Sequence, residues 1–231
     1  MLGIQVFALV FLVSTVFSKT ANFESIDSAI AHDDLSGVLL HIKLDPNCLN
    51  QGNHPVLSPL HQSILRKKDK IALALIEEGA NINNVDGSLR TPLHLCVERG
   101  LPEVAKALVA AGASPNQLNK LGWTPLHNAA AIDRITMAQL LIDGGADVKA
   151  LSRQGGTPLH EAAASASSDM VRLILTHGVD PNLADKDGRS ALDVAIAFKN
   201  QAAAIILRKI SEETIGLIIK IWRRGSESNR R

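Results

Sequence analysis

Four histidines recur along the sequence at one spacing, and they are the side chains best suited to bind a metal ion. His61, His94, His127 and His160 follow one another at intervals of 33 residues. Histidine nitrogens bind zinc at about 2.1 Å, so several must converge on one point to share an ion. Equivalent residues of packed helices lie about 10 Å apart. The spacing therefore predicts a structural role for each histidine, and we expect no metal and no other cofactor.

Other motifs that support catalysis are missing from the sequence. His160 and Glu161 resemble the start of a zinc-protease helix, but Ala164 stands where the second histidine is required. The sequence lacks G-x-S-x-G, a phosphate-binding G-x-x-x-x-G-K and a dinucleotide-binding G-x-G-x-x-G. We therefore expect a protein that is not an enzyme.

Two cysteines, Cys48 and Cys96, are a candidate disulfide, but their placement argues against it. Cys96 falls on a predicted helix and Cys48 in an early loop, more than one 33-residue interval away. A disulfide needs Cα atoms within about 7 Å. We expect two free thiols.

The histidines belong to a longer pattern that predicts where helices begin and end. Thr-Pro-Leu-His starts at Thr91, Thr124 and Thr157, Ser-Pro-Leu-His starts at Ser58, and a weaker Ser-Ala-Leu-Asp starts at Ser190. Threonine can cap a helix and proline fits its first position, so each motif predicts a helix start, with the histidine bonding back toward the threonine.

A second set of landmarks keeps the same period. Glycines at 79, 112, 145 and 178 predict the left-handed residue that closes a second helix, expected at 102–111 in one repeat. Asp86-Gly87 and Asp187-Gly188 predict turns in the connecting segments. Each interval therefore contains two helices and a turn.

In these motifs the sequence resembles the ankyrin-repeat family, whose 33-residue unit carries Thr-Pro-Leu-His. The resemblance implies an all-α fold, an ankyrin-repeat solenoid of stacked helix-turn-helix units with β-turn fingers. With only 3% aromatic residues, its core must be aliphatic. The resemblance and the composition of the two ends together predict these divisions: a signal peptide or membrane anchor at 1–18, a degenerate N-terminal capping repeat at 19–57, four repeats within 58–189 (58–90, 91–123, 124–156 and 157–189), a C-terminal capping repeat at 190–210, and a short helix with a disordered basic tail at 211–231.

The two ends of the chain carry separate signals. Residues 1–17 contain no charged side chain, which predicts a signal peptide cleaved near Ser18 and an exported protein, periplasmic or secreted. An uncleaved membrane anchor and a mis-assigned start are the alternatives.

At the other end of the chain, residues 215–222 are mostly apolar. One interpretation is a short helix that covers the end of the stack, and the other is a disordered tail.

The resemblance implies binding of a partner protein through the finger tips and the concave face of the first helices. A net charge of +1 gives no support for nucleic-acid binding. We expect a monomer whose partner has an acidic surface and an apolar anchor, with membrane contact only if residues 1–17 stay attached. The alternatives are a membrane-tethered scaffold or a secreted effector or toxin component. The candidate partner-binding residues are Trp123, Leu121, Lys120, Ile132, Arg90, Arg99, Arg153 and Arg189.

Trp123 is the central candidate because tryptophan and arginine dominate the energetics of protein interfaces. The competing interpretation is that Trp123 folds over its own finger and that the surrounding charges are solvated.

Overall fold

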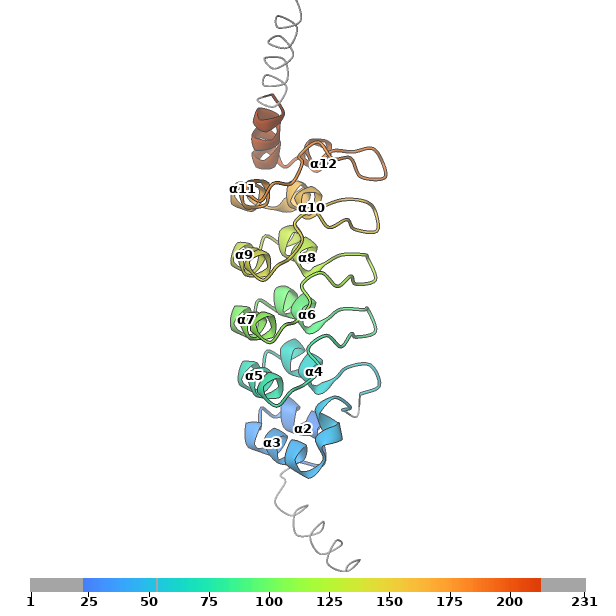
Figure 1. The fold of residues 1–231 in the computed structure, drawn as a ribbon, viewed down its shortest axis with the longest axis vertical. Helices are drawn as coiled ribbons and strands as arrows, with labels where there is room; N and C mark the ends of the chain where they lie inside the picture. The colour runs from blue at the N-terminus through green and yellow to red at the C-terminus, as the bar shows by residue number, and fades with distance from the viewer. Residues whose placement is uncertain (1–22, 53, 213–231) are drawn as a thin grey trace, which may run out of the picture. The chain divides into compact units, whose positions relative to one another are not determined.

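The structure is a computed structural model that describes residues 23–52 and 54–212 (Figure 1). The chain divides into two compact units, residues 1–113 and 114–231. The described residues are helical, with turns and loops between the helices and no strand. None of the described helices is long and apolar enough to cross a membrane. The expected signal peptide and the apolar stretch at 215–222 lie outside the described residues.

The first unit begins with a helix pair that lacks the Thr-Pro-Leu-His start. Helix α2 (Ile26–Ala31) is capped by the Ser25 hydroxyl, which accepts the N–H of Ser28, and it packs against α3 (Leu35–Leu44). A short 3-10 helix, η1 (Pro46–Leu49), follows. Cys48 therefore lies in a helical turn rather than in the expected loop.

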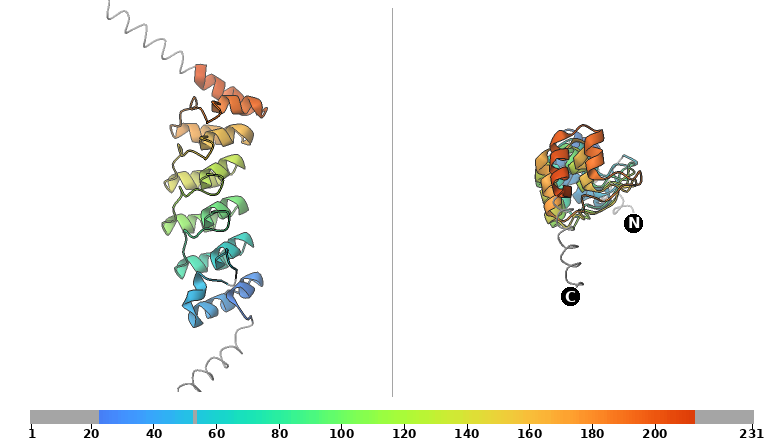
Figure 2. Two further views of the ribbon diagram at one scale, coloured as in Figure 1. Left: turned by 90° about the vertical axis from the view of Figure 1, so that its right-hand side faces the viewer. Right: turned by 90° about the horizontal axis from the view of Figure 1, so that it is seen from above.

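Two regular helix pairs complete the first unit. They are α4 (Pro59–Leu65) with α5 (Asp69–Glu77), and α6 (Pro92–Arg99) with α7 (Pro102–Ala110). Helix α4 packs between α2 and α6, while α5 packs against α7, so the pairs lie one above the other (Figures 1 and 2). The second helix expected at 102–111 ends one residue early, because Ala111 is its C-cap.

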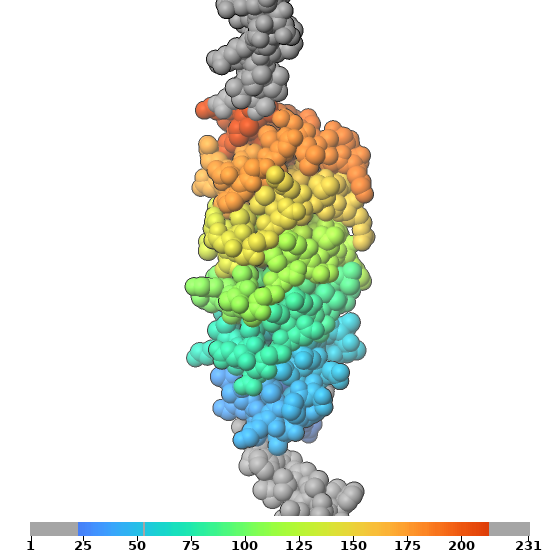
Figure 3. All heavy atoms as spheres, in the orientation of Figure 1, coloured from blue at the N-terminus to red at the C-terminus, as the bar shows by residue number. Residues whose placement is uncertain are grey.

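The second unit repeats this arrangement. Its pairs are α8 (Pro125–Ala131) with α9 (Ile135–Asp143), α10 (Pro158–Ser165) with α11 (Ser168–Thr176), and α12 (Ala191–Ala197) with the helical residues 201–212. Helix α10 packs between α8 and α12. On the face drawn in Figure 3, side chains fill the space between successive pairs of this unit.

The core is aliphatic, as the composition predicts. Leucines of the helix-start motif, Leu60, Leu93, Leu126 and Leu159, are fully buried. Burying such a side chain is worth about 1.5–3 kcal/mol, so these positions hold neighbouring pairs together. The described helices start where the motifs predict, whereas the boundaries between whole repeats stay a prediction.

The cysteines are free thiols, as expected. Burial raises the pKa of the Cys48 thiol to about 11, with Asp45 and Asp27 adding to the shift. Burial also raises the pKa of Cys96, which lies in the core of the first unit. Since a thiolate is the reactive form, neither cysteine is a candidate nucleophile at neutral pH.

Candidate partner-binding surface

The histidines of the repeated motif act at the helix starts, as predicted. In α6 the N–H of Thr91 donates to Nδ1 of His94 at 3.2 Å, and the Thr91 hydroxyl lies 2.9 Å from the same nitrogen. Thr124 with His127, and Thr157 with His160, repeat this contact. Among the described residues, no three histidine, cysteine or carboxylate side chains are grouped as a metal would need.

Each of three histidines also makes a bond that the sequence did not reveal. The Nε2 atom of each ring lies against a carbonyl oxygen 29 residues further along the chain, and because a carbonyl oxygen only accepts hydrogen bonds, Nε2 carries the proton and donates it. His61 reaches the carbonyl of Arg90, His127 that of Gly156 and His160 that of Arg189, each at 3.2 Å. Burial lowers the pKa of His61, which keeps its ring neutral. These histidines therefore fix the following finger to the helix start.

We call the turn segment that precedes each helix-start motif a finger. A side chain at the start of each finger holds its turn by hydrogen bonds. The Oδ1 atom of Asp86 accepts the N–H groups of Ser88 and Arg90 at 2.8 and 2.9 Å. Asn119 and Asp185, 33 and 99 residues further on, make the same pair of bonds within their own fingers. Ser152 holds the equivalent position in the finger between those of Asn119 and Asp185, and its hydroxyl is buried without a hydrogen-bond partner. Serine is one atom too short to repeat the aspartate geometry.

The left-handed residue of the first finger is not the glycine that the sequence singles out. Gly122, Gly155 and Gly188 have φ of +76°, +79° and +77°, and Leu89 takes the equivalent place with φ of +57°. Gly87 lies in a turn, as predicted, but it has no positive φ. The first finger therefore places a leucine in a conformation that favours glycine.

Two of the predicted partner-binding arginines are already engaged by carboxylates close to them in the chain. The guanidinium of Arg90 lies 2.7 Å from Asp86 and 2.8 Å from Glu98. The guanidinium of Arg189 lies 2.9 Å from Asp185 and 2.8 Å from Asp187. Burial alone would raise the pKa of Asp86, but the hydrogen bonds and charge of Arg90 outweigh it and lower that pKa.

Comparison with protein families settles what this architecture is. A family model of ankyrin repeats in three copies matches residues 27–119 and 126–215, and a second ankyrin-repeat model matches residues 102–142. The chain belongs to the ankyrin-repeat family. Its fold class is the expected all-α ankyrin-repeat solenoid. Comparison with curated proteins found no significant match.

Ankyrin repeats generally mediate protein–protein interaction and are typically not catalytic, so the exposed side chains of these repeats are the candidate contacts with a partner. Arg90 and Arg99 belong to the first unit, and Arg99 is exposed at the end of α6. The other six predicted residues belong to the second unit. They are Lys120, Leu121, Trp123, Ile132, Arg153 and Arg189.

Within the second ankyrin unit, Trp123 lies at the junction of a finger and α8. Its half-buried ring stacks on the imidazole of His127, with centroids 6.5 Å apart and an interplanar angle of 18°. Leu121, two residues earlier, and Ile132, the C-cap of α8, are both exposed. The tryptophan thus packs on its own helix start and leaves part of its surface accessible.

Glu161 is a polar residue of this ankyrin unit that sequence reasoning did not place on the surface. It follows the helix-start histidine of α10, is partly buried, and has no hydrogen-bond or ion-pair partner in the described chain. Gln62, at the equivalent place in α4, donates to Asp27 at 2.7 Å. Burial raises the pKa of Glu161 to about 7. The sequence could have revealed Glu161, because it is the only acidic residue at this position of the repeat. The other repeats hold Gln62, Leu95, Asn128 and Val194 there.

Proposed function

We propose that this chain is an exported ankyrin-repeat protein without catalytic activity that binds one partner protein, chiefly through its second unit. The observation that carries the proposal is that Trp123 leaves part of its ring accessible in the same repeat where Leu121 and Ile132 are exposed. Tryptophan is the residue type most enriched among interface hot spots, which makes Trp123 the proposed anchor.

The charges near this surface suggest the chemistry of the partner. Lys120 and Arg153 are exposed on successive fingers, and neither side chain is engaged in an ion pair within the described chain. Arg90 and Arg189 differ, since each already holds two carboxylates. We therefore favour an acidic partner surface that meets Lys120 and Arg153 around an apolar contact, with Arg99 as a further basic candidate in the first unit.

Export is the proposed setting because residues 1–17 are mostly apolar and contain no charged side chain, and Lys19 is the first basic residue. The alternative is a membrane-anchored scaffold that retains residues 1–17. The N-terminal residue and intact mass of the protein recovered from cell fractions decide between them. A chain beginning at Lys19 outside the cytoplasm supports export, whereas a chain beginning at Met1 in the membrane fraction supports the anchor.

Partner binding is tested by capture with the tagged full chain, comparing Leu121→Ala with Leu151→Ala. Both leucines are exposed on neighbouring fingers of the second unit, so neither change should disturb the fold. Partner recovery should fall about tenfold for Leu121→Ala and for Trp123→Ala, and stay near the parent level for Leu151→Ala. Equal recovery by all variants, with circular dichroism showing intact folds, would overturn the proposed surface.

A further inference from the structure

The last helix pair of the second unit has an outer face that nothing in the described chain covers. Ala130 in α8 and Ala163 in α10 are fully buried, and the next pair packs against both helices. Ile196 holds the same place in α12, yet its side chain is 52% exposed. Leu192 is half-buried, whereas its equivalents Leu126 and Leu159 are fully buried. Positions that a following helix pair buries in the preceding repeats are therefore exposed in the last one.

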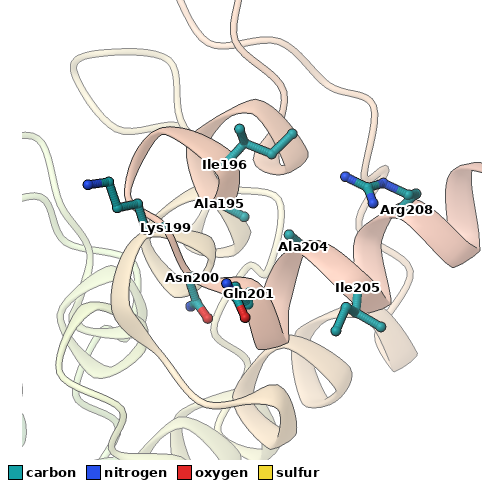
Figure 4. Close-up of a pocket in the computed structure, with 8 residues that line it drawn as sticks. All are labelled: Ala195, Ile196, Lys199, Asn200, Gln201, Ala204, Ile205 and Arg208. Carbon is teal, nitrogen blue, oxygen red and sulfur yellow. The ribbon is translucent and has the colours of Figure 1, made fainter.

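A groove runs between α12 and the helical residues 201–212 at this face (Figure 4). Its volume is about 490 Å³, and Ile196, Ala204 and Ile205 line it together with the basic side chains Lys199 and Arg208. Ile196 and Ile205 are both more than half exposed. Burying an isoleucine is worth about 1.5–3 kcal/mol, so an apolar segment that covers the groove has a substantial driving force.

We propose that residues 215–222 of this same chain occupy the groove and cap the stack. Six of these eight residues are apolar, and they are Ile215, Leu217, Ile218, Ile219, Ile221 and Trp222. The described residues end at 212, only a few positions before the segment, and Gly216 near its start has the conformational freedom that a chain reversal needs. The polar and basic remainder, residues 223–231, has no comparable apolar content.

Covalent attachment favours this occupant over a free partner. A segment joined by a short linker meets its site at an effective concentration in the millimolar range, which a separate protein seldom reaches. The segment carries one charge, Lys220, which can stay in solvent beside the basic groove. An acidic partner helix or a second copy of the chain are the other occupants, and the experiment distinguishes them.

Trp222 supplies a direct reporter, since Trp123 is the only other tryptophan. In the full chain carrying Trp123→Phe, Trp222 should emit at a shorter wavelength than free tryptophan and resist quenching by acrylamide several-fold. Ile196→Asp should abolish that protection. Leu151→Asp is the matched control, because Leu151 is 53% exposed on a finger, and it should leave the protection unchanged.

A stability measurement keeps the proposal testable independently of the reporter. Ile218→Asp in the full chain should lower Tm by about 3–8 °C, and truncation after residue 212 should do the same. Ile196→Asp should add little to either change, because the contact is already lost. If acrylamide quenches Trp222 as readily as free tryptophan in every variant, the proposal is overturned. Protection that rises with protein concentration would assign the groove to a second copy, and protection only after an acidic helical peptide is added would assign it to a partner.

Discussion

At the helix starts, one arrangement recurs with little change, whereas in the fingers the same backbone shape is held by different side chains. Thr91, Thr124 and Thr157 each donate their N–H to the ring of the histidine three residues later. The finger bases hold Asp86, Asn119, Ser152 and Asp185, and only three of these make the pair of turn bonds. The stack needs one geometry at every helix start, but a finger needs only to reverse the chain.

This difference separates the residues that build the stack from those free to meet a partner. Arg90 and Arg189 directly precede a helix-start motif, and each forms ion pairs with two carboxylates close to it in the chain. Trp123 and Gly156 occupy the same place without such ion pairs. The residue directly before the helix-start motif thus has two roles. In two repeats it is an arginine that forms ion pairs, and in another it is Trp123, which offers apolar surface.

The largest effect should come from the repeated core. Leu126→Ala removes a fully buried side chain from α8 and should lower the free energy of unfolding by about 2–5 kcal/mol. Urea denaturation followed by circular dichroism measures the loss. Leu121→Ala, on an exposed finger position, is the control and should change stability by less than about 0.5 kcal/mol. Equal effects of the two changes would mean that α8 does not pack as described.

A smaller effect should distinguish finger glycines from helix-end glycines. Gly122 has φ of +76°, and a Cβ there would lie 2.5 Å from the backbone nitrogen of Arg153. Gly145 has φ of +87° with nothing near the added Cβ. We expect Gly122→Ala to cost about 2–4 kcal/mol and Gly145→Ala about 1 kcal/mol, because only the first adds a clash to the left-handed strain. Thermal and urea unfolding of the pair measure the gap, and equal losses would show that the neighbouring finger moves away freely.

The features that recur at fixed spacing could be predicted from the sequence. The helix starts, the bond from the histidine back to threonine and the left-handed Gly112 follow from local preferences and a period of 33 residues. They involve residues only a few positions apart, so local sequence suffices.

The features that depend on neighbours far along the chain could not be predicted. The bond from His61 to the carbonyl of Arg90 spans 29 residues, and the isolation of Glu161 depends on what surrounds α10. The ion pairs of Arg90 and Arg189 join residues two to eight positions apart, but they depend on the folded shape of the finger, which the residue types alone do not reveal. The sequence therefore grouped Arg90 and Arg189 with Trp123 as partner-binding candidates, although their surroundings differ.

Glu161 is an exception within the repeated helices, and its effect should depend on pH. Its pKa is about 7 in the folded chain and 4.5 ordinarily, so the folded state binds the proton more tightly. Stability should therefore fall as pH rises from about 4.5 to about 7 and then level off. Because the side chain is only partly buried, solvent screens the charge and we discount the effect to about 1–2 kcal/mol.

The test of this pH dependence is Glu161→Gln, which keeps the shape and removes the charge. The variant should match the parent at pH 4 and be more stable at pH 8 by about 1–2 kcal/mol in urea denaturation. Glu103→Gln, at an exposed position of α7, is the matched control and should change stability by less than about 0.5 kcal/mol. A stability gain that does not depend on pH would refute an ionisation origin.

The smallest effect tests whether fingers tolerate strain that helix starts would not. Leu89 has φ of +57° where the other fingers have glycine, and a left-handed L-residue costs about 1–2 kcal/mol. Leu89→Gly should therefore stabilise the chain by about 0.5–1 kcal/mol, since the greater flexibility of glycine in the unfolded chain offsets part of the gain. Leu118→Gly is matched in exposure, because both leucines are 43% exposed, but it relieves no positive φ and should destabilise. If both changes destabilise equally, Leu89 makes contacts that repay its conformation, and the first finger is then built by packing as the helices are.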